Sequence, residues 1–150
     1  MHCAAGAAWT AILLTLGGCS VKAPPLVGAV TITDAKGVVQ ASIASLPRGA
    51  AIYLDVTITQ DVETLGADWT VTCGSALPEG TLPPGMVDTS CGTFVPNHTF
   101  SGPMPTYPGA TGVVTLFTAP ANIPKGGTVT ILVHATSLPS SISSLTLTIT

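Results

Sequence analysis

A strict alternation of aliphatic and polar side chains is the feature that most limits how this chain can fold. Between Ala51 and Thr59, every second residue is aliphatic: Ile52, Leu54, Val56 and Ile58. Successive side chains of a β-strand point to opposite faces of its sheet, so these four would share one face. The residues between them would share the other face. The segment is therefore predicted to be a strand with one buried face.

Similar alternation, or an apolar run bounded by turn residues, recurs along the rest of the chain. No helical pattern separates these segments, so an all-β fold of two packed sheets, a β-sandwich, is predicted. Trp69 and Phe117 are the large aromatic residues expected in its core. The further predicted strands are Val27–Thr33, Val38–Leu46, Asp68–Cys73, Gly112–Thr118, Thr128–Thr136 and Ser143–Thr150.

Four short motifs follow one another along the predicted domain: DWTVTCG at 68–74, CGTF at 91–94, LFTAP at 116–120 and GTVTI at 127–131. In this order, and followed by a threonine-rich closing strand, they resemble the bacterial immunoglobulin-like domains of surface and secreted proteins. The resemblance implies an immunoglobulin-like β-sandwich of about seven strands over residues 26–150. It also implies that Trp69 lies between the two sheets and that Phe117 packs from a neighbouring strand.

The segment 74–110 is rich in proline and glycine, so neither helix nor strand is expected in it. Members of the resembled family commonly join the two cysteines by a short link, whereas this chain inserts Ser75–Ser90. A long loop of this kind in a compact domain is often functional. The preferred interpretation is nevertheless a loop that covers the edge of the sandwich, and a binding loop is the alternative. Its candidate contact residues are Met86, Phe100, Met104 and Tyr107.

The N-terminus begins with an apolar run, Ala7–Leu16, that is followed by Gly17, Gly18 and Cys19. About ten apolar residues are too few for a membrane-spanning helix, which needs roughly 20. The run and the small residues before the cysteine resemble a bacterial lipoprotein signal peptide. The resemblance implies a signal peptide at 1–18, lipidation of Cys19 and a tether at 19–25. The alternatives are a cleaved signal without lipid and an uncleaved anchor over Cys3–Val21.

Four cysteines occur in the chain, and this interpretation accounts for each of them. Cys3 would be removed with the signal peptide, and Cys19 would carry the lipid. Cys73 and Cys91 would remain as a pair in an exported protein, where disulfides persist. We predict that they are bonded, which in the chain-entropy model stabilises the fold by about 3 kcal/mol. Zinc binding is the alternative, but the spacing of these two thiols is unsuited to it.

Charged residues make up only 7% of the chain, and the net charge is -3. Nucleic-acid binding depends on clustered Lys and Arg, so this class of partner is excluded. The sequence contains no G-x-S-x-G, H-E-x-x-H or P-loop motif. His134 lies between two residues predicted to face inward, so it is expected to face solvent. His98 is expected to be a solvated loop residue; pairing with Asp88 is the alternative.

Three acidic residues, Asp61, Glu63 and Asp68, lie close together around a predicted strand connection. Their carboxylates could bind calcium, but a polar turn is the preferred interpretation, and no metal or cofactor is predicted. We expect a non-catalytic, lipid-anchored module of the cell envelope, at the outer membrane or cell surface, with a structural, adhesion or assembly role. The first alternative is a module that binds a carbohydrate or an envelope protein through the 74–110 loop. The second is a small envelope enzyme.

Overall fold

The structure, a computed structural model, describes residues 22–78, 81–84, 86–100 and 114–150. These residues form nine strands and no helix, and the strands make two sheets of four and five. Among them there is consequently no helix long and apolar enough to cross a membrane. The predicted all-β sandwich is confirmed, with nine strands where about seven were expected.

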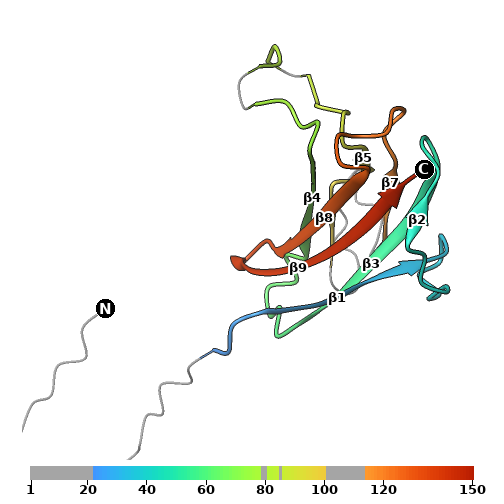
Figure 1. Ribbon diagram of the computed structural model, residues 1–150. Helices are drawn as coiled ribbons and strands as arrows, with labels where there is room; N and C mark the ends of the chain where they lie inside the picture. The colour runs from blue at the N-terminus through green and yellow to red at the C-terminus, as the bar shows by residue number, and fades with distance from the viewer. Residues whose placement is uncertain (1–21, 79–80, 85, 101–113) are drawn as a thin grey trace, which may run out of the picture.

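The first sheet is antiparallel throughout and has the strand order β1-β3-β7-β5 (Figure 1). Strand β3 occupies the segment with the strictest alternation, and its predicted bounds match the observed ones. Leu54, at the middle of β3, is completely buried, as a residue on the inward face should be. The strands of this sheet are β1 (Leu26–Thr33), β3 (Ala51–Thr59), β5 (Thr93–Val95) and β7 (Val114–Thr118).

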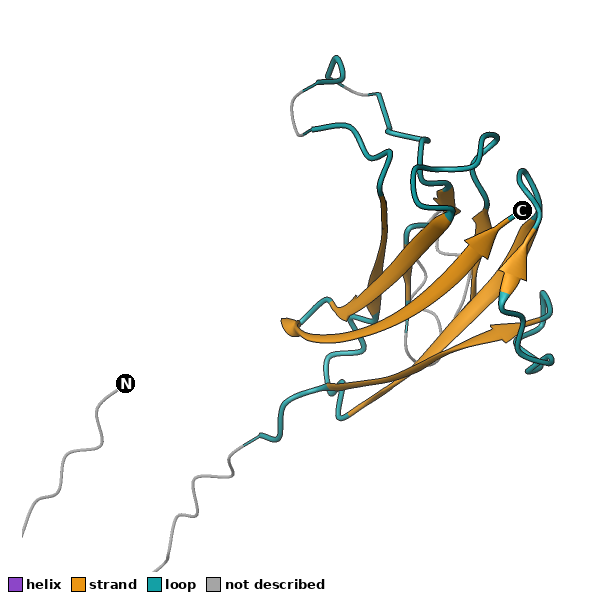
Figure 2. Cartoon of the chain, in the orientation of Figure 1, coloured by secondary structure: helices purple, strands orange, loops and turns teal. Residues whose placement is uncertain are grey.

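The second sheet has the order β2-β9-β8-β4-β6. Figure 2, coloured by secondary structure, shows strands and loops and no helix in the described residues. Strand β2 is parallel to β9, and the other pairs are antiparallel. The orders of the two sheets are those of an immunoglobulin-like sandwich, whose A-B-E-D sheet faces a sheet containing G, F and C. The strands of this sheet are β2 (Ser45–Leu46), β4 (Ala67–Cys73), β6 (His98–Thr99), β8 (Thr128–Ala135) and β9 (Leu138–Ile149).

The core lies between the sheets and is centred on aromatic residues. Phe117 is completely buried and Trp69 is 2% exposed. Phe94 lies between them, with its ring centroid 5.0 Å from that of Phe117 and 6.0 Å from that of Trp69. The indole Nε1 of Trp69 donates a hydrogen bond of 2.8 Å to Oγ1 of Thr99, which satisfies the polar end of a buried ring. Completely buried aliphatic residues surround this group: Leu54, Val129, Ile131, Val133 and Leu147.

The predicted strand at Val38–Leu46 is largely wrong. Only β2 and an isolated bridge between Val39 and Thr33 form there. The carboxylate of Asp34 accepts hydrogen bonds from the backbone N–H groups of Lys36 and Val38, which closes a turn instead of extending a strand. Val38 and Val39 are both exposed, so this segment has no buried face of the kind that stabilises a strand.

The prediction that the proline-rich segment contains no strand is also wrong, because β5 and β6 lie within it. Both are edge strands, β5 of the first sheet and β6 of the second. Pro96 lies between them and follows a cis peptide bond. A proline lacks the N–H group that a central strand needs, but it is tolerated where edge strands begin or end. Short edge strands can therefore flank it.

Candidate functional site

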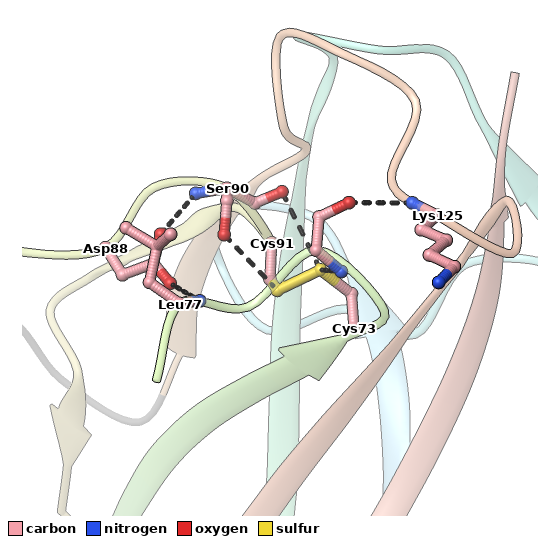
Figure 3. The surroundings of a disulfide bond; sticks show 7 residues. Cys73, Leu77, Asp88, Ser90, Cys91 and Lys125 are labelled. Atoms are coloured by element: carbon pink, nitrogen blue, oxygen red, sulfur yellow. Dashed lines mark hydrogen bonds between the residues drawn. A yellow bond between two sulfur atoms is a disulfide. The ribbon is translucent and has the colours of Figure 1, made fainter. Parts of the chain in front are cut away.

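The disulfide between Cys73 and Cys91 joins the two sheets at one end of the sandwich (Figure 3). Cys73 is the last residue of β4, in the second sheet, and Cys91 precedes β5, in the first sheet. Their Cα atoms are 5.5 Å apart and 18 positions separate them in sequence. The bond therefore closes the inserted loop at its base and also links the sheets from which its two ends emerge. We call residues 74–90 the disulfide loop.

Asp88 holds the two arms of the disulfide loop together. One carboxylate oxygen accepts a hydrogen bond of 2.8 Å from the N–H of Leu77, and the other accepts one of 2.9 Å from the N–H of Ser90 (Figure 3). The hydrogen bond from Leu77, followed by those from Ser90, lowers the pKa of Asp88 below its ordinary value. On the other side, the hydroxyl of Ser75 accepts a hydrogen bond of 2.7 Å from the N–H of Lys125. The base of the loop is thus fixed to its surroundings.

A groove of about 420 Å³ lies between the base of the disulfide loop and the connection from β7 to β8. None of the residues that line it is charged. Four lining residues, Thr89, Thr93, Thr118 and Asn122, have polar side chains that make no hydrogen bond to another described residue. Hydroxyl and amide groups both donate and accept hydrogen bonds. The groove can therefore accommodate an uncharged ligand that carries polar groups of both kinds.

The predicted contact residues of the binding loop are not brought together. Met86 is 63% exposed near the outer part of the disulfide loop, beside Val87, which is 74% exposed. Phe100 follows β6, and its ring meets the ring of His98 edge-on at 4.6 Å. It adjoins Gly66, just before β4 begins, whereas the disulfide loop starts where β4 ends. Met104 and Tyr107 lie outside the described residues.

A second polar group, which the sequence did not reveal, is centred on Asp68. Its Oδ1 is 2.7 Å from Nδ1 of His98, and its Oδ2 accepts a hydrogen bond of 2.9 Å from Oγ1 of Thr136. Nε2 of His134 is 3.7 Å from the same Oδ2. Asp68 is paired with His98 on β6 and with His134 on β8, so three neighbouring strands place these side chains on one face of the sheet. The predicted position of His98 in a solvated loop is wrong, and so is the alternative pairing with Asp88, because His98 lies on β6 and contacts Asp68.

The side chains of Asp68, His98 and His134 link three neighbouring strands, and we call them the Asp68 brace. All three side chains are about one third exposed. No hydroxyl or thiol of a described residue hydrogen-bonds either imidazole. Within the described ranges, no three His, Cys, Asp or Glu residues are arranged to hold a metal ion. Neither the groove at the disulfide loop nor the second groove described below is lined by these residues.

The three acidic residues considered for calcium are engaged separately. Asp61 accepts hydrogen bonds from the N–H groups of Leu65 and Gly66 and so closes the turn between β3 and β4. Glu63 forms an ion pair with Lys22, with 3.2 Å between Oε1 and Nζ. Asp68 belongs to the brace. The preferred interpretation of Asp61 and Glu63, a polar turn, agrees with these contacts.

The opposite end of the sandwich from the disulfide loop carries a smaller groove of about 280 Å³. It is lined by Lys22–Pro25, by Gln60–Glu63 and by Ser137 and Leu138, where β8 turns into β9. The predicted lipidation site, Cys19, lies outside the described residues, three positions before Lys22. Comparison of the chain with protein-family models, with curated proteins and with solved structures finds no match.

Proposed function

We propose that the chain is a non-catalytic, lipid-anchored module of the bacterial cell envelope, built on an immunoglobulin-like sandwich of the bacterial type. The supporting observation is that two features lie at opposite ends of the sandwich. Lys22, three residues after the proposed lipidation site Cys19, contacts the loop that leads into β4. The disulfide loop leaves the sandwich where β4 ends (Figure 1). An anchored sandwich would thus present the loop away from the membrane, as adhesion or envelope assembly requires.

The proposal includes no catalytic role. Ser, Thr or Cys catalysis needs a base within hydrogen-bond reach of the nucleophile. In the described part of the chain, His98 and His134 contact the carboxylate of Asp68 and no such nucleophile. The carboxylate is shared between strands, which supports a structural role for the group.

The anchor is tested by expressing the full chain in a bacterium that processes lipoproteins. We expect the mature protein in the membrane fraction, with an acylated Cys19 peptide in its mass spectrum, and Cys19→Ala in the soluble fraction or unprocessed. Cys3→Ala is the matched control and should remain lipidated, because residue 3 would be removed with the signal peptide. A free N-terminus beyond residue 19 would contradict the anchor, and so would a Cys19→Ala chain that is processed and localised like the parent.

A second candidate function, binding through the disulfide loop, is favoured by the groove at its base. Four polar side chains line this groove without a partner among the described residues, and Met86 and Val87 are exposed beyond it. The disulfide and Asp88 order the arms of the loop before any ligand arrives. Such pre-organisation lowers the entropic cost of binding. The lining is uncharged, which fits a neutral polysaccharide better than a charged polymer.

The binding function is tested with purified envelope polysaccharide immobilised on beads. We expect the wild-type domain to be retained and the double variant Thr93→Ala/Asn122→Ala to be released, with an unchanged thermal midpoint. Thr72→Ala removes an exposed hydroxyl on β4 that does not line the groove, and it should bind like the wild type. Equal retention of all three proteins, or of none, would contradict this function without affecting the anchor.

A further inference from the structure

We infer that one end of the sandwich lies directly on the lipid surface, with the turn at Val62 as its point of contact. This end, which we call the tether end, consists of the residues that line the smaller groove, Lys22–Pro25, Gln60–Glu63 and Ser137–Leu138, and of Thr64 and Leu65, which complete the turn. The inference rests on the proposed lipidation of Cys19. It adds direct contact between the domain and the bilayer, and it names the surface that makes this contact.

The first step is that the residues after the anchor already belong to the domain. Lys22 forms an ion pair with Glu63, and Lys22–Pro25 line a groove together with the turn between β3 and β4. Of the predicted tether, 19–25, the residues from Lys22 to Pro25 therefore contact the domain, and three positions separate Lys22 from Cys19. Any movement of the domain relative to the bilayer is limited by the length of that short connection.

The second step is the reach of the connection. From Cys19 to Lys22 the chain can span at most about 11 Å, whatever its conformation. Acyl chains on Cys19 would hold that residue at the boundary of the hydrocarbon core, and the headgroup layer on one side is about 5–8 Å thick. Lys22 and the turn that it contacts must therefore lie within or immediately above the headgroups.

The third step identifies the contact residue. Val62 is 67% exposed, at a turn in which Gln60 and Thr64 have positive φ angles of 62° and 52°. Asp61 closes this turn through the N–H groups of Leu65 and Gly66. The turn is thus held in one conformation by hydrogen bonds from backbone N–H groups to the Asp61 carboxylate. It presents an aliphatic side chain outward beside the ion pair of Lys22 and Glu63.

The charges of the tether end indicate how it is held. Its described charged residues are Lys22, Asp61 and Glu63, which carry one positive and two negative charges. Attraction to anionic lipid requires a cluster of Lys or Arg at the surface, and this end has none. Contact therefore depends on the high local concentration that the anchor imposes. The unlipidated domain should have no measurable affinity for vesicles, and salt should not release the lipidated one.

The disulfide loop provides an internal reference at the other end. The seven residues of β4 run from the tether end to Cys73, and at about 3.3 Å per residue this separates the two ends by about 20 Å. Val87, in the disulfide loop, is 74% exposed. Figure 1 shows the turn between β3 and β4 and the disulfide loop at opposite ends of the domain. Val62 and Val87, one in each of these segments, are exposed valines of similar accessibility.

The test places a nitroxide spin label on the lipidated protein at either position, as Val62→Cys or Val87→Cys. Cys73 and Cys91 are bonded and Cys19 would be acylated, so each variant has one reactive thiol. The proteins are reconstituted into phosphatidylcholine vesicles that contain a nickel-chelating lipid, which relaxes labels near the headgroups. We expect relaxation of the label at 62 to be several-fold greater than at 87. A flexible Gly/Ser spacer of twelve residues inserted after Ser20 should remove the difference.

Flotation of the vesicles distinguishes failure of the proposed anchor from failure of the proposed membrane contact. If the chain with Cys19 intact does not float with lipid, both the anchor and this inference are wrong. If it floats but the two labels relax equally, the anchor stands and the inference is overturned. Persistence of the difference after insertion of the spacer would also overturn it, because contact would then not depend on the short connection.

Discussion

Removal of the disulfide should destabilise the whole domain and not only the loop that it closes. The perturbation is the double variant Cys73→Ala/Cys91→Ala. The bond closes a segment of 18 positions, and the chain-entropy model assigns about 3 kcal/mol to a loop of this length. Because the bond also joins β4 of one sheet to the start of β5 in the other, it restricts the unfolded chain between both sheets, and its removal favours unfolding of the whole domain. For a domain of this size, the thermal midpoint should fall by about 10 °C.

Urea unfolding followed by tryptophan fluorescence measures this effect. Trp69 is the only tryptophan after residue 18, and it lies in the core at 2% exposure, so its emission reports global unfolding. Thr72→Ala, an exposed change next to Cys73, is the control and should leave the midpoint unchanged. A double variant that unfolds at the wild-type urea concentration, with the same slope, would refute the reasoning. It would show that the bond orders the loop without constraining the sheets.

Three other changes test particular contacts. Trp69→Phe leaves the buried hydroxyl of Thr99 without its partner and should cost about 1–3 kcal/mol in urea unfolding; if the added change Thr99→Val recovers none of this, the hydrogen bond is not the cause. Asp88 has a lowered pKa, so its hydrogen bonds to the loop should persist at and above its ordinary pKa of 3.8 and be lost as pH falls through the lower pKa of the folded state. Amide exchange at Leu77 should accelerate only in that lower pH range. In Asp88→Asn, exchange at Leu77 should be faster at every pH. Burial raises the pKa of Asp55 above 3.8, although a hydrogen bond from the N–H of Val56 opposes this shift. The free energy of unfolding of the wild type should therefore decline as pH rises from 3.8 through the folded-state pKa. Asp55→Asn should abolish that decline, and an unchanged pH profile in this variant would contradict the prediction.

Alternation predicted the strands whose two faces differ most. Strand β3 has its predicted bounds, and β8 differs by one residue at its end. In β8 the inward residues Val129, Ile131 and Val133 are completely buried. Periodicity succeeds here because burial of one face is the main source of stability for such strands. The predicted start of strand β9, Ser143, is later than the observed start, Leu138, because Pro139, Ser140 and Ser141 interrupt the alternation there.

Features that depend on pairing between distant segments could not be predicted in this way. Strands β5 and β6 are two or three residues long and flank Pro96, so they have no periodicity of their own. They exist because β7 and β4 provide edges to which they can bond. The Asp68 group is hidden for the same reason. The alternating pattern of β4 and β8 places Asp68 and His134 on outward faces. Only the register of β4 with β8 and β6 shows that these residues are opposite each other.

The pairing of β4 also explains why the disulfide lies where it does. Strand β6 pairs only with Ala67 and Asp68, so the remaining outer edge of β4, from Thr70 to Cys73, has no partner strand among the described residues. The Asp68 brace and the hydrogen bond from the N–H of Trp69 to the carbonyl of Asn97 hold the first part of β4. The disulfide holds the last residue, beyond the reach of β6. Loss of the bond should therefore leave Thr70–Cys73 supported by β8 alone, and these amides should exchange faster than those at the start of β4.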